Sequence, residues 1–206
     1  AASHAGLTLG EDGATHQTLE DIGLMKMLPG MVVINPCDYN QTKAATIAAA
    51  EYEGPVYLRF GRPAVPVFTP ADQKFEIGKG ILMNEGTDVT IVATGHLVWE
   101  SLVAAAELEK EGISCEVINI HTIKPLDEEI IINSVKKTGK IVTVEEHSII
   151  GGLGGAVCEC LSEKAPVPVK RIGINDVFGE SGPAVALLEK YGLDAEGIYK
   201  QIKEFV

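Results

Sequence analysis

The amino-acid sequence predicts an α/β protein, in which a partial α/β domain is followed by an open, mostly parallel, doubly wound α/β domain. From about residue 85 onward, short apolar runs alternate with amphipathic helical patterns. That alternation is typical of parallel sheets covered by helices on both faces. A stretch with three prolines, residues 63–80, separates this half from a first half that shows only two strands and two helices. A sheet that small buries little apolar surface, so we expect its domain to continue outside this sequence.

The elements of the first half follow from local patterns. Apolar residues at helical spacing predict a helix over residues 18–27, and a short apolar run predicts a strand over 31–34. Asp38 is followed three residues later by Gln41, the spacing of a capping box, which predicts a helix through about residue 50. The run "GPVYLRFGR", which begins with the turn pair Gly-Pro, predicts the second strand.

The second half alternates regularly between strand and helix patterns. Apolar runs predict its strands, and amphipathic patterns predict its helices, one of which is capped by Asp127. In chain order, we expect strands over 88–94, 114–120, 140–146 and 167–174, and helices over 97–111, 127–137, 154–164 and the C-terminal residues.

Charge and hydropathy argue against two kinds of partner. The formal net charge of −12 repels a nucleic-acid backbone. No apolar run reaches the roughly 18 residues that a membrane span requires, and the first residues lack the features of a signal peptide. We therefore expect no nucleic acid, no membrane and a cytoplasmic location.

The cysteines indicate reduced thiols. Cys37, Cys115, Cys158 and Cys160 show no paired spacing of a disulfide framework. The Cys-Glu-Cys pair would point its thiols to different faces of a helix, and zinc sites use wider spacing with a second ligand pair. We expect no metal site in this chain.

The loop "GEDGATHQ" carries Asp12 and His16 four residues apart, just before the first helix. Such a pair can converge on one ligand beside backbone N–H groups. The same spacing also fits solvated residues that lead into a helix, and the pattern alone favours this reading. A magnesium-diphosphate signature is rejected, because Glu11 replaces its first glycine.

The turn "GGLGGAV" departs from a dinucleotide-binding fingerprint, because Val157 takes the place of the third glycine and no acidic residue ends a following strand. We interpret its glycines as serving a tight turn and close helix packing. His96, His121 and His147 each follow a strand, at the edge where ligands gather in parallel sheets. A hydrogen-bonded structural histidine is the favoured interpretation of each, and His147 is the best site candidate of the three.

The run from "GEDGATHQ" through "LEDIGLMKMLPGM", together with "GPVYLRFGR", resembles the pyrimidine-binding domain of thiamine-diphosphate-dependent transketolases, in particular the split type. The later runs "DVTIVATG", "IHTIKPLD" and "VEEHSIIGGLGGAV" resemble the C-terminal domain of the same family. The resemblance covers essentially the whole chain. It implies the C-terminal part of a pyrimidine-binding domain over residues 1–67, a linker over 68–84 and a transketolase C-terminal domain over 85–206.

The resemblance also implies four site residues. His16 matches the histidine near the reacting carbon, a catalytic role, and His4, twelve residues earlier, matches the histidine that contacts the acceptor sugar phosphate. Asp12 matches the aspartate that recognises a sugar hydroxyl, and Arg62 matches the arginine at the phosphate end. The residue types suit these roles, since a guanidinium fork matches phosphate oxygens and histidine can accept or donate a proton near neutral pH.

The family resemblance further implies what this chain lacks. Thiamine diphosphate and magnesium are expected to be held mainly by parts absent from this chain, in an N-terminal subunit or domain, so the chain alone is expected to be inactive. We expect sugar phosphate substrates, a ketol transferase of the pentose phosphate pathway, and a homodimer formed through both domains. The chain is interpreted as the tail of a larger polypeptide.

Two other functions stay open. The later motifs are shared with deoxyxylulose-phosphate synthase and with the β subunits of oxo-acid dehydrogenases, although "THQ" and the helix after it favour transketolase. The C-terminal sheet could instead be a dimerisation or regulatory module. Such a module predicts a stable dimer without affinity for sugar phosphates.

Overall fold

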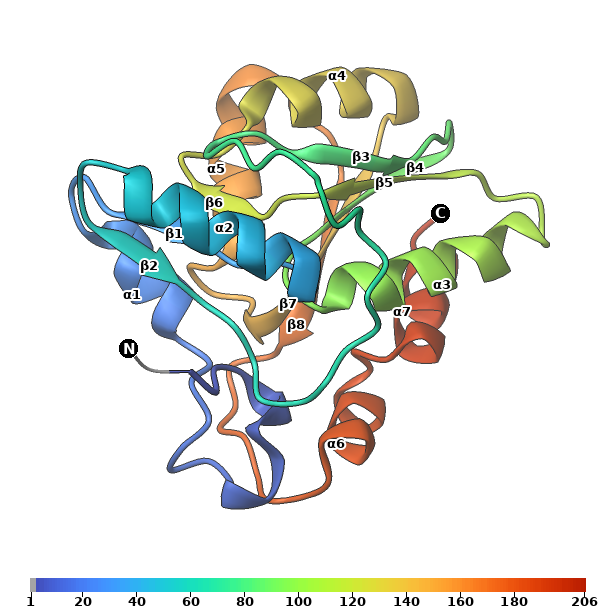
Figure 1. Ribbon diagram of the computed structural model, residues 1–206. Coiled ribbons are helices and arrows are strands. Elements are labelled where there is room, and N and C mark those ends of the chain that lie inside the picture. The colour runs from blue at the N-terminus through green and yellow to red at the C-terminus, as the bar shows by residue number, and fades with distance from the viewer. Residues whose placement is uncertain (1–2) are drawn as a thin grey trace.

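Two β-sheets organise residues 3–206, the part of the chain that the computed structural model describes (Figure 1). The larger sheet has five strands in the order β3-β5-β4-β7-β8. Its strands are β3 (Ile81–Asn84), β4 (Val89–Ala93), β5 (Cys115–Asn119), β7 (Ile141–Ser148) and β8 (Val169–Ile174). All neighbours pair in parallel except β3, which is antiparallel to β5 at the edge. The predicted open, mostly parallel sheet is therefore confirmed.

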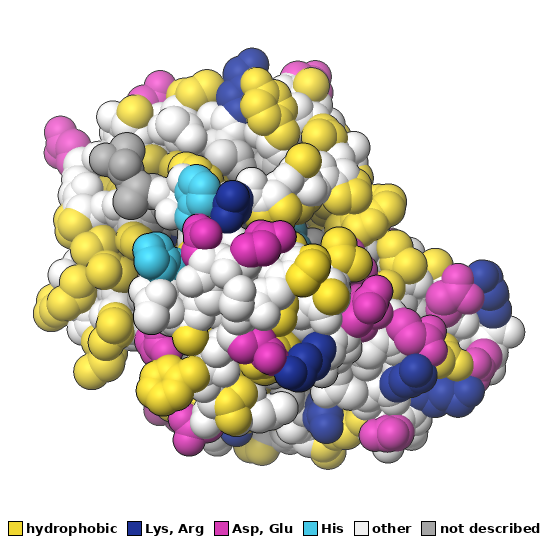
Figure 2. All heavy atoms as spheres, turned by 90° about the horizontal axis from the view of Figure 1, so that it is seen from below, with side chains coloured by type: hydrophobic (Ala, Val, Ile, Leu, Met, Phe, Trp, Pro, Cys, Tyr) yellow, Lys and Arg dark blue, Asp and Glu magenta, His cyan; other side chains and the backbone are white. Residues whose placement is uncertain are grey.

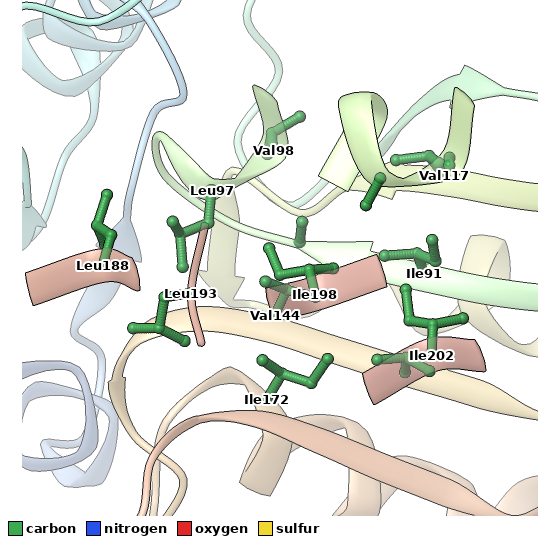
Figure 3. Packing of buried hydrophobic residues seen from close by; sticks show 14 of the residues in the cluster. Ile91, Leu97, Val98, Val117, Val144, Ile172, Leu188, Leu193, Ile198 and Ile202 are labelled. Atoms are coloured by element: carbon green, nitrogen blue, oxygen red, sulfur yellow. The ribbon is translucent and has the colours of Figure 1, made fainter. Parts of the chain in front are cut away.

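Helices cover both faces of the larger sheet, as Figure 1 shows. Helices α3 (Leu97–Glu109) and α7 (Ala195–Lys203) pack on one face, and α4 (Glu128–Thr138) and α5 (Leu153–Lys164) pack on the other. The strands contribute side chains to two hydrophobic cores, because successive side chains point to opposite faces of the sheet. In β4, for example, Ile91 belongs to the first core, shown in Figure 3, and its neighbour Val92 to the second.

The smaller sheet joins the two halves of the chain. Its strands β1 (Val32–Ile34) and β2 (Val56–Leu58) come from the first half and pair in parallel, whereas β6 (Thr122–Lys124) comes from the second half and pairs with β1 antiparallel. Helix α1 (Asp21–Met27) packs against β1, and α2 (Tyr39–Glu51) packs against β2. The residues before the proline-rich stretch are therefore bound directly to those after it.

The predicted helix caps are present. The Asp38 carboxylate accepts a hydrogen bond from the backbone N–H of Gln41 at 2.9 Å at the start of α2, and Asp127 accepts one from Ile130 N–H at 3.4 Å at the start of α4. Both carboxylates also bind the proline-rich stretch, since the backbone N–H of Thr69 donates to Asp38 and that of Gly80 donates to Asp127. The two caps thus fix both ends of the segment between the halves.

Strand β3 lies within the range that the sequence assigns to the linker. Its four residues alternate between half-buried and exposed positions, and its pairing with β5 shifts register between Leu82 and Asn84. A strand this short at a sheet edge carries little periodic signal, which is why the sequence pattern did not predict it. Residues 59–80 contain no helix or strand, and the domain boundaries themselves stay a prediction.

The N-terminal segment lies against the C-terminal part of the chain. A 3₁₀ segment, η1 (Leu7–Asp12), packs on α6 (Ala184–Tyr191), and Figure 1 shows these blue and red segments together at one end of the molecule. Helices α6 and α7 confirm the predicted helical C-terminus. Every helix within residues 3–206 is too short or too polar to cross a bilayer.

Candidate functional site

The Gln17 side chain holds the loop that carries "GEDGATHQ" in place by hydrogen bonds to the backbone. The Gln17 side-chain amide donates to the carbonyl oxygens of Leu7 at 3.0 Å and Glu180 at 2.9 Å, and it lies 3.4 Å from that of Gly10. Gln17 is buried, although His16 beside it is exposed. The glutamine of the "THQ" tripeptide is therefore a structural clamp, a role that the sequence analysis missed because one of its acceptors lies 163 residues away.

Two glycines permit the tight path of this loop. Gly10 and Gly13 have φ values of 83° and 73°, in the region that favours glycine. The Gly13 N–H donates to the Gly10 carbonyl at 3.1 Å, and the Ser181 hydroxyl donates to the Glu11 carbonyl. The loop is thus seated on the segment before α6, with the side chains of residues 11, 12 and 16 exposed.

The structure brings two of the predicted site residues together. Arg62 Nη1 lies 3.3 Å from Asp12 Oδ2 and donates at 3.1 Å to the carbonyl oxygen of Leu9. The two charged side chains are 45% and 50% exposed. Each is therefore oriented by the protein while part of its surface faces solvent.

The two predicted histidines lie on the same N-terminal segment. His4 is exposed with φ 76°, and its neighbour Ala5 donates to the carbonyl of Phe60 at 3.2 Å, two residues before Arg62. His16 is exposed, with Nδ1 2.9 Å from the Thr15 hydroxyl. Among the described side chains no hydrogen bond joins either histidine to the Arg62–Asp12 pair. Figure 2 shows histidine, basic and acidic side chains gathered on the face seen from below.

Beneath the loop lies a buried polar cluster. Arg59 donates through Nε to Asp21 Oδ2 at 2.7 Å, and the Tyr57 hydroxyl donates to the same oxygen at 2.7 Å. Burial acts to raise the pKa of Asp21, but Arg59 and Tyr57 outweigh it and the pKa is lowered. Asp21 is thus held ionised beside a fully buried guanidinium, which joins α1 to the end of β2.

Glu146 on β7 connects the larger sheet to this cluster. Its carboxylate accepts from the backbone N–H of Thr8 and lies 2.7 Å from His96 Nε2, while its backbone carbonyl accepts from Arg59 Nη2 at 3.0 Å. Burial would raise the pKa of Glu146, but His96 and Arg59 oppose it and the net direction is downward. His147, the next residue, is fully buried with Nδ1 2.7 Å from the Ser148 carbonyl oxygen, the environment expected of a structural histidine.

Glu145 explains the glycine-rich turn. Its carboxylate accepts from the N–H groups of Leu153 at 2.7 Å and Gly154 at 2.8 Å, at the start of α5. A Cβ at Gly152 would lie 2.0 Å from Glu145 Oε2. Burial raises the pKa of Glu145, against the opposing effect of His147 and these N–H groups. The turn therefore encloses a carboxyl group of its own chain, which accounts for its glycines.

His121 also has a structural environment. It is 1% exposed, its Nδ1 lies 3.0 Å from the Thr122 hydroxyl, and its ring centroid lies 4.1 Å from that of Phe75. Burial lowers the pKa of His121 to about 4, with a small opposing effect of Asp127. The ring is therefore neutral at physiological pH.

A pocket of about 440 Å³ lies where the carboxyl ends of strands from both sheets face one another. Its lining includes residues that follow β1, β2 and β4, together with Glu146 of β7: Asn35, Cys37, Asp38, Arg59, Phe60, Gly61, His96 and Glu146. The carboxyl edge of parallel strands is where α/β proteins bind ligands. The four predicted site residues lie outside this lining, although Gly61 and Pro63 on either side of Arg62 belong to it.

Among residues 3–206, no three His, Cys, Asp or Glu side chains are grouped so that they could hold a metal ion. The cysteines in this range are free thiols, and burial raises the pKa of Cys115 to about 12.

Comparison with known proteins identifies both halves. Residues 78–198 match the family model described as "Transketolase, C-terminal domain", and residues 1–67 match "Transketolase, pyrimidine binding domain". A protein of Methanocaldococcus jannaschii described as a transketolase C-terminal section is 52% identical over 206 residues, covering 98% of this chain and 64% of the relative. A 6-deoxy-6-sulfo-D-fructose transketolase subunit of Clostridium sp. is 47% identical over 203 residues, covering 98% and 63%.

A solved structure gives the same picture. The structure described as a split gene transketolase, inactive beta4 tetramer, is 48% identical and superposes with a TM-score of 0.90. The match covers 98% of this chain and 64% of that chain. This chain therefore spans about 64% of the length of such relatives.

Proposed function

This chain belongs to the transketolase family, and from that premise we propose that it binds sugar phosphates for the transfer of a two-carbon ketol unit. In this proposal the chain acts together with an N-terminal transketolase subunit or domain. That partner holds thiamine diphosphate and magnesium, and the cofactor supplies the electron sink for carbon–carbon cleavage. A homodimer, a cytoplasmic location and a place in the pentose phosphate pathway stay predictions.

The Arg62–Asp12 pair carries the proposal. A sugar phosphate presents an anion at one end and hydroxyl groups along its length. Arg62 offers a partly exposed guanidinium whose other N–H groups can bind phosphate oxygens. Asp12, 3.3 Å away, offers a carboxylate that can accept from a hydroxyl. One charged pair thus supplies both kinds of recognition.

The exposed histidines complete the proposed site. His16 accepts or donates the proton that moves as the ketose bond breaks and re-forms, and His4 contacts the acceptor phosphate. Both are exposed and lie on the segment that Gln17 and Gly13 hold in place. Exposure leaves their ring nitrogens available to a substrate.

The reaction is tested with the polypeptide that carries this chain, mixed with a candidate N-terminal partner, thiamine diphosphate and magnesium. Xylulose 5-phosphate with ribose 5-phosphate is offered first, and a 6-deoxy-6-sulfo ketose second, because the Clostridium relative is named for that sugar. Ketol transfer supports the proposal. Pyruvate decarboxylation would instead identify a synthase or dehydrogenase, and a stable dimer without sugar-phosphate affinity would identify a dimerisation module.

Point variants test the residues. Loss of the guanidinium in Arg62→Ala is expected to raise KM for phosphorylated substrates by about tenfold or more. Asp12→Asn is expected to weaken discrimination between epimeric sugars, and His16→Ala to lower kcat by about a hundredfold. Lys164→Ala is the matched control, because Lys164 and Glu128 are each 43% exposed and paired on α5 and α4. Turnover of His16→Ala within about twofold of wild type would exclude the role assigned to that residue.

A further inference from the structure

We propose that Glu146 is a positioning residue, which holds both segments of the sugar-phosphate site from within the C-terminal domain. One segment is the loop that contains His4, Asp12 and His16. The other is the end of β2, which leads to Arg62. The role rests on the proposed function for its effect on catalysis, but the contacts themselves can be tested without any substrate.

The first contact holds the loop. Glu146 Oε1 accepts a hydrogen bond from the backbone N–H of Thr8, which follows His4 by four residues. The loop passes so close to this carboxylate that a Cβ at Gly6 would lie 2.3 Å from Glu146 Oε2. Gly6 also has φ 92°, in the region that favours glycine. The loop backbone is therefore shaped around the Glu146 side chain.

The second contact holds the end of β2. The backbone carbonyl of Glu146 accepts from Arg59 Nη2 at 3.0 Å, three residues before Arg62. The Arg59 N–H donates in turn to the Ile34 carbonyl at 2.8 Å. A single residue of β7 thus contacts both segments: its side chain binds the main chain of the loop, and its carbonyl group binds the Arg59 side chain.

The carboxylate itself is held by the larger sheet. Glu146 is 2% exposed, and its second oxygen lies 2.7 Å from Nε2 of His96, the residue before α3. Both carboxylate oxygens therefore have partners, and the side chain has no freedom to follow the loop if the loop moves. Fixing a site residue through such a rigid partner is what positions binding groups to within a fraction of an ångström.

Glu145 is a natural control. It is the preceding residue of the same strand and is buried as well, but its carboxylate binds the start of α5, and among the described residues it makes no hydrogen bond to the loop. A change at Glu145 perturbs the same strand and replaces a buried carboxyl group. The Glu145 variant therefore measures how a change in β7 affects the protein when the contact with the loop is kept.

Hydrogen exchange of the full chain tests the contact directly. In Glu146→Ala, exchange of the Thr8 amide is expected to be about tenfold faster or more, because its acceptor is removed. Glu146→Gln keeps an acceptor oxygen at the same place and is expected to restore most of the protection. Glu145→Gln retains only one acceptor oxygen, so it is expected to speed exchange at one of the two amides, Leu153 or Gly154, and to leave Thr8 unchanged. Equal Thr8 exchange in wild type and Glu146→Ala would overturn the proposal.

Kinetics of the reconstituted enzyme test the consequence. Glu146→Ala is expected to raise KM for the sugar phosphate by about tenfold, with a smaller change in kcat, and Glu146→Gln to recover much of the loss. If Glu146→Ala does not fold, Glu146→Asp takes its place, because the shorter side chain withdraws the carboxylate from the Thr8 N–H. Thr8 exchange and a KM equal to those of wild type in Glu146→Asp would then overturn the proposal. Absence of ketol transfer by the wild type would contradict the proposed function alone, since Thr8 exchange judges the contact independently.

Discussion

Arg59 and Asp21 form an ion pair that is almost completely enclosed: Arg59 Nε lies 2.7 Å from Asp21 Oδ2, and the side chains are only 3% and 6% exposed. The pair joins the end of β2 to the start of α1, the helix that follows the proposed substrate loop. The pKa of Arg59 is raised, because the attraction of Asp21 outweighs the opposing effect of burial. Neither charged group is exposed enough for water to solvate it if its partner is removed.

Removing the carboxylate should therefore destabilise the protein strongly. Asp21→Asn leaves the guanidinium buried without its counter-ion, and we expect a loss of about 3–5 kcal/mol in the free energy of unfolding, measured by urea denaturation at pH 7. Glu159→Gln breaks the Lys26–Glu159 pair, in which Glu159 is 73% exposed, and should cost less than about 1 kcal/mol. Equal losses of unfolding free energy in the two variants would contradict the prediction that burial makes the Arg59–Asp21 pair the more important one.

The Gln17 clamp gives a second prediction. Gln17→Glu has nearly the same shape but places a carboxylate against the Leu7 and Glu180 carbonyls. We expect a destabilisation of about 1–3 kcal/mol at pH 7, because acceptors then face one another without a donor. The loss should shrink in acid, where the new carboxyl group is protonated and can donate. His16→Ala, one residue away and exposed, should change stability by less than about 0.5 kcal/mol.

The glycine-rich turn gives a third prediction. In Gly152→Ala the new methyl group meets the Glu145 carboxylate, which cannot move because two N–H groups hold it. We expect a destabilisation of about 1–3 kcal/mol, read from the thermal or urea midpoint. Gly155→Ala lies inside α5, where a Cβ finds its nearest atom at 3.6 Å, and should be neutral or stabilising by up to about 1 kcal/mol. A neutral Gly152→Ala would show that the turn does not enclose the carboxylate.

His121 predicts a pH dependence of stability. Its folded-state pKa of about 4 lies below the value of 6.5 for the free side chain, so the unfolded chain binds more protons between these two values. The stability contributed by the neutral ring is complete above pH 6.5 and is lost as the pH falls towards 4, by up to about 3 kcal/mol. Urea denaturation at several pH values should show a weaker acid dependence in His121→Phe, which keeps an aromatic ring beside Phe75 but cannot be protonated. The same slope in both proteins would contradict the prediction.

Local signals were sufficient for most of the fold. The capping aspartates Asp38 and Asp127 were predicted from spacing, because the capped N–H groups lie three residues along the chain. The parallel strands were predicted because burial on both faces requires continuous apolar runs. The edge strand β3 was missed, because it is short and half exposed.

The candidate site was only partly predictable. Asp12 and Arg62 were identified through a family resemblance, and their proximity depends on a contact across 50 residues. The roles of Gln17 and Glu146 left no local signal. The partners of Glu146 include Thr8, 138 residues away, and Gln17 reaches across to Glu180. Such pairings are set by the tertiary fold, which periodicity does not encode.

The antiparallel pairing of β1 with β6 has a consequence for synthesis of the chain on the ribosome. When β1 emerges, one of its edges can pair with β2 soon afterwards. The other edge waits for residues 122–124, which are made only after β3, β4, α3 and β5 of the larger sheet. Contacts between segments so distant in sequence form slowly, and an unpaired edge invites association with other nascent chains. Deleting β6 should therefore reduce the yield of soluble protein during translation more than its three residues would suggest.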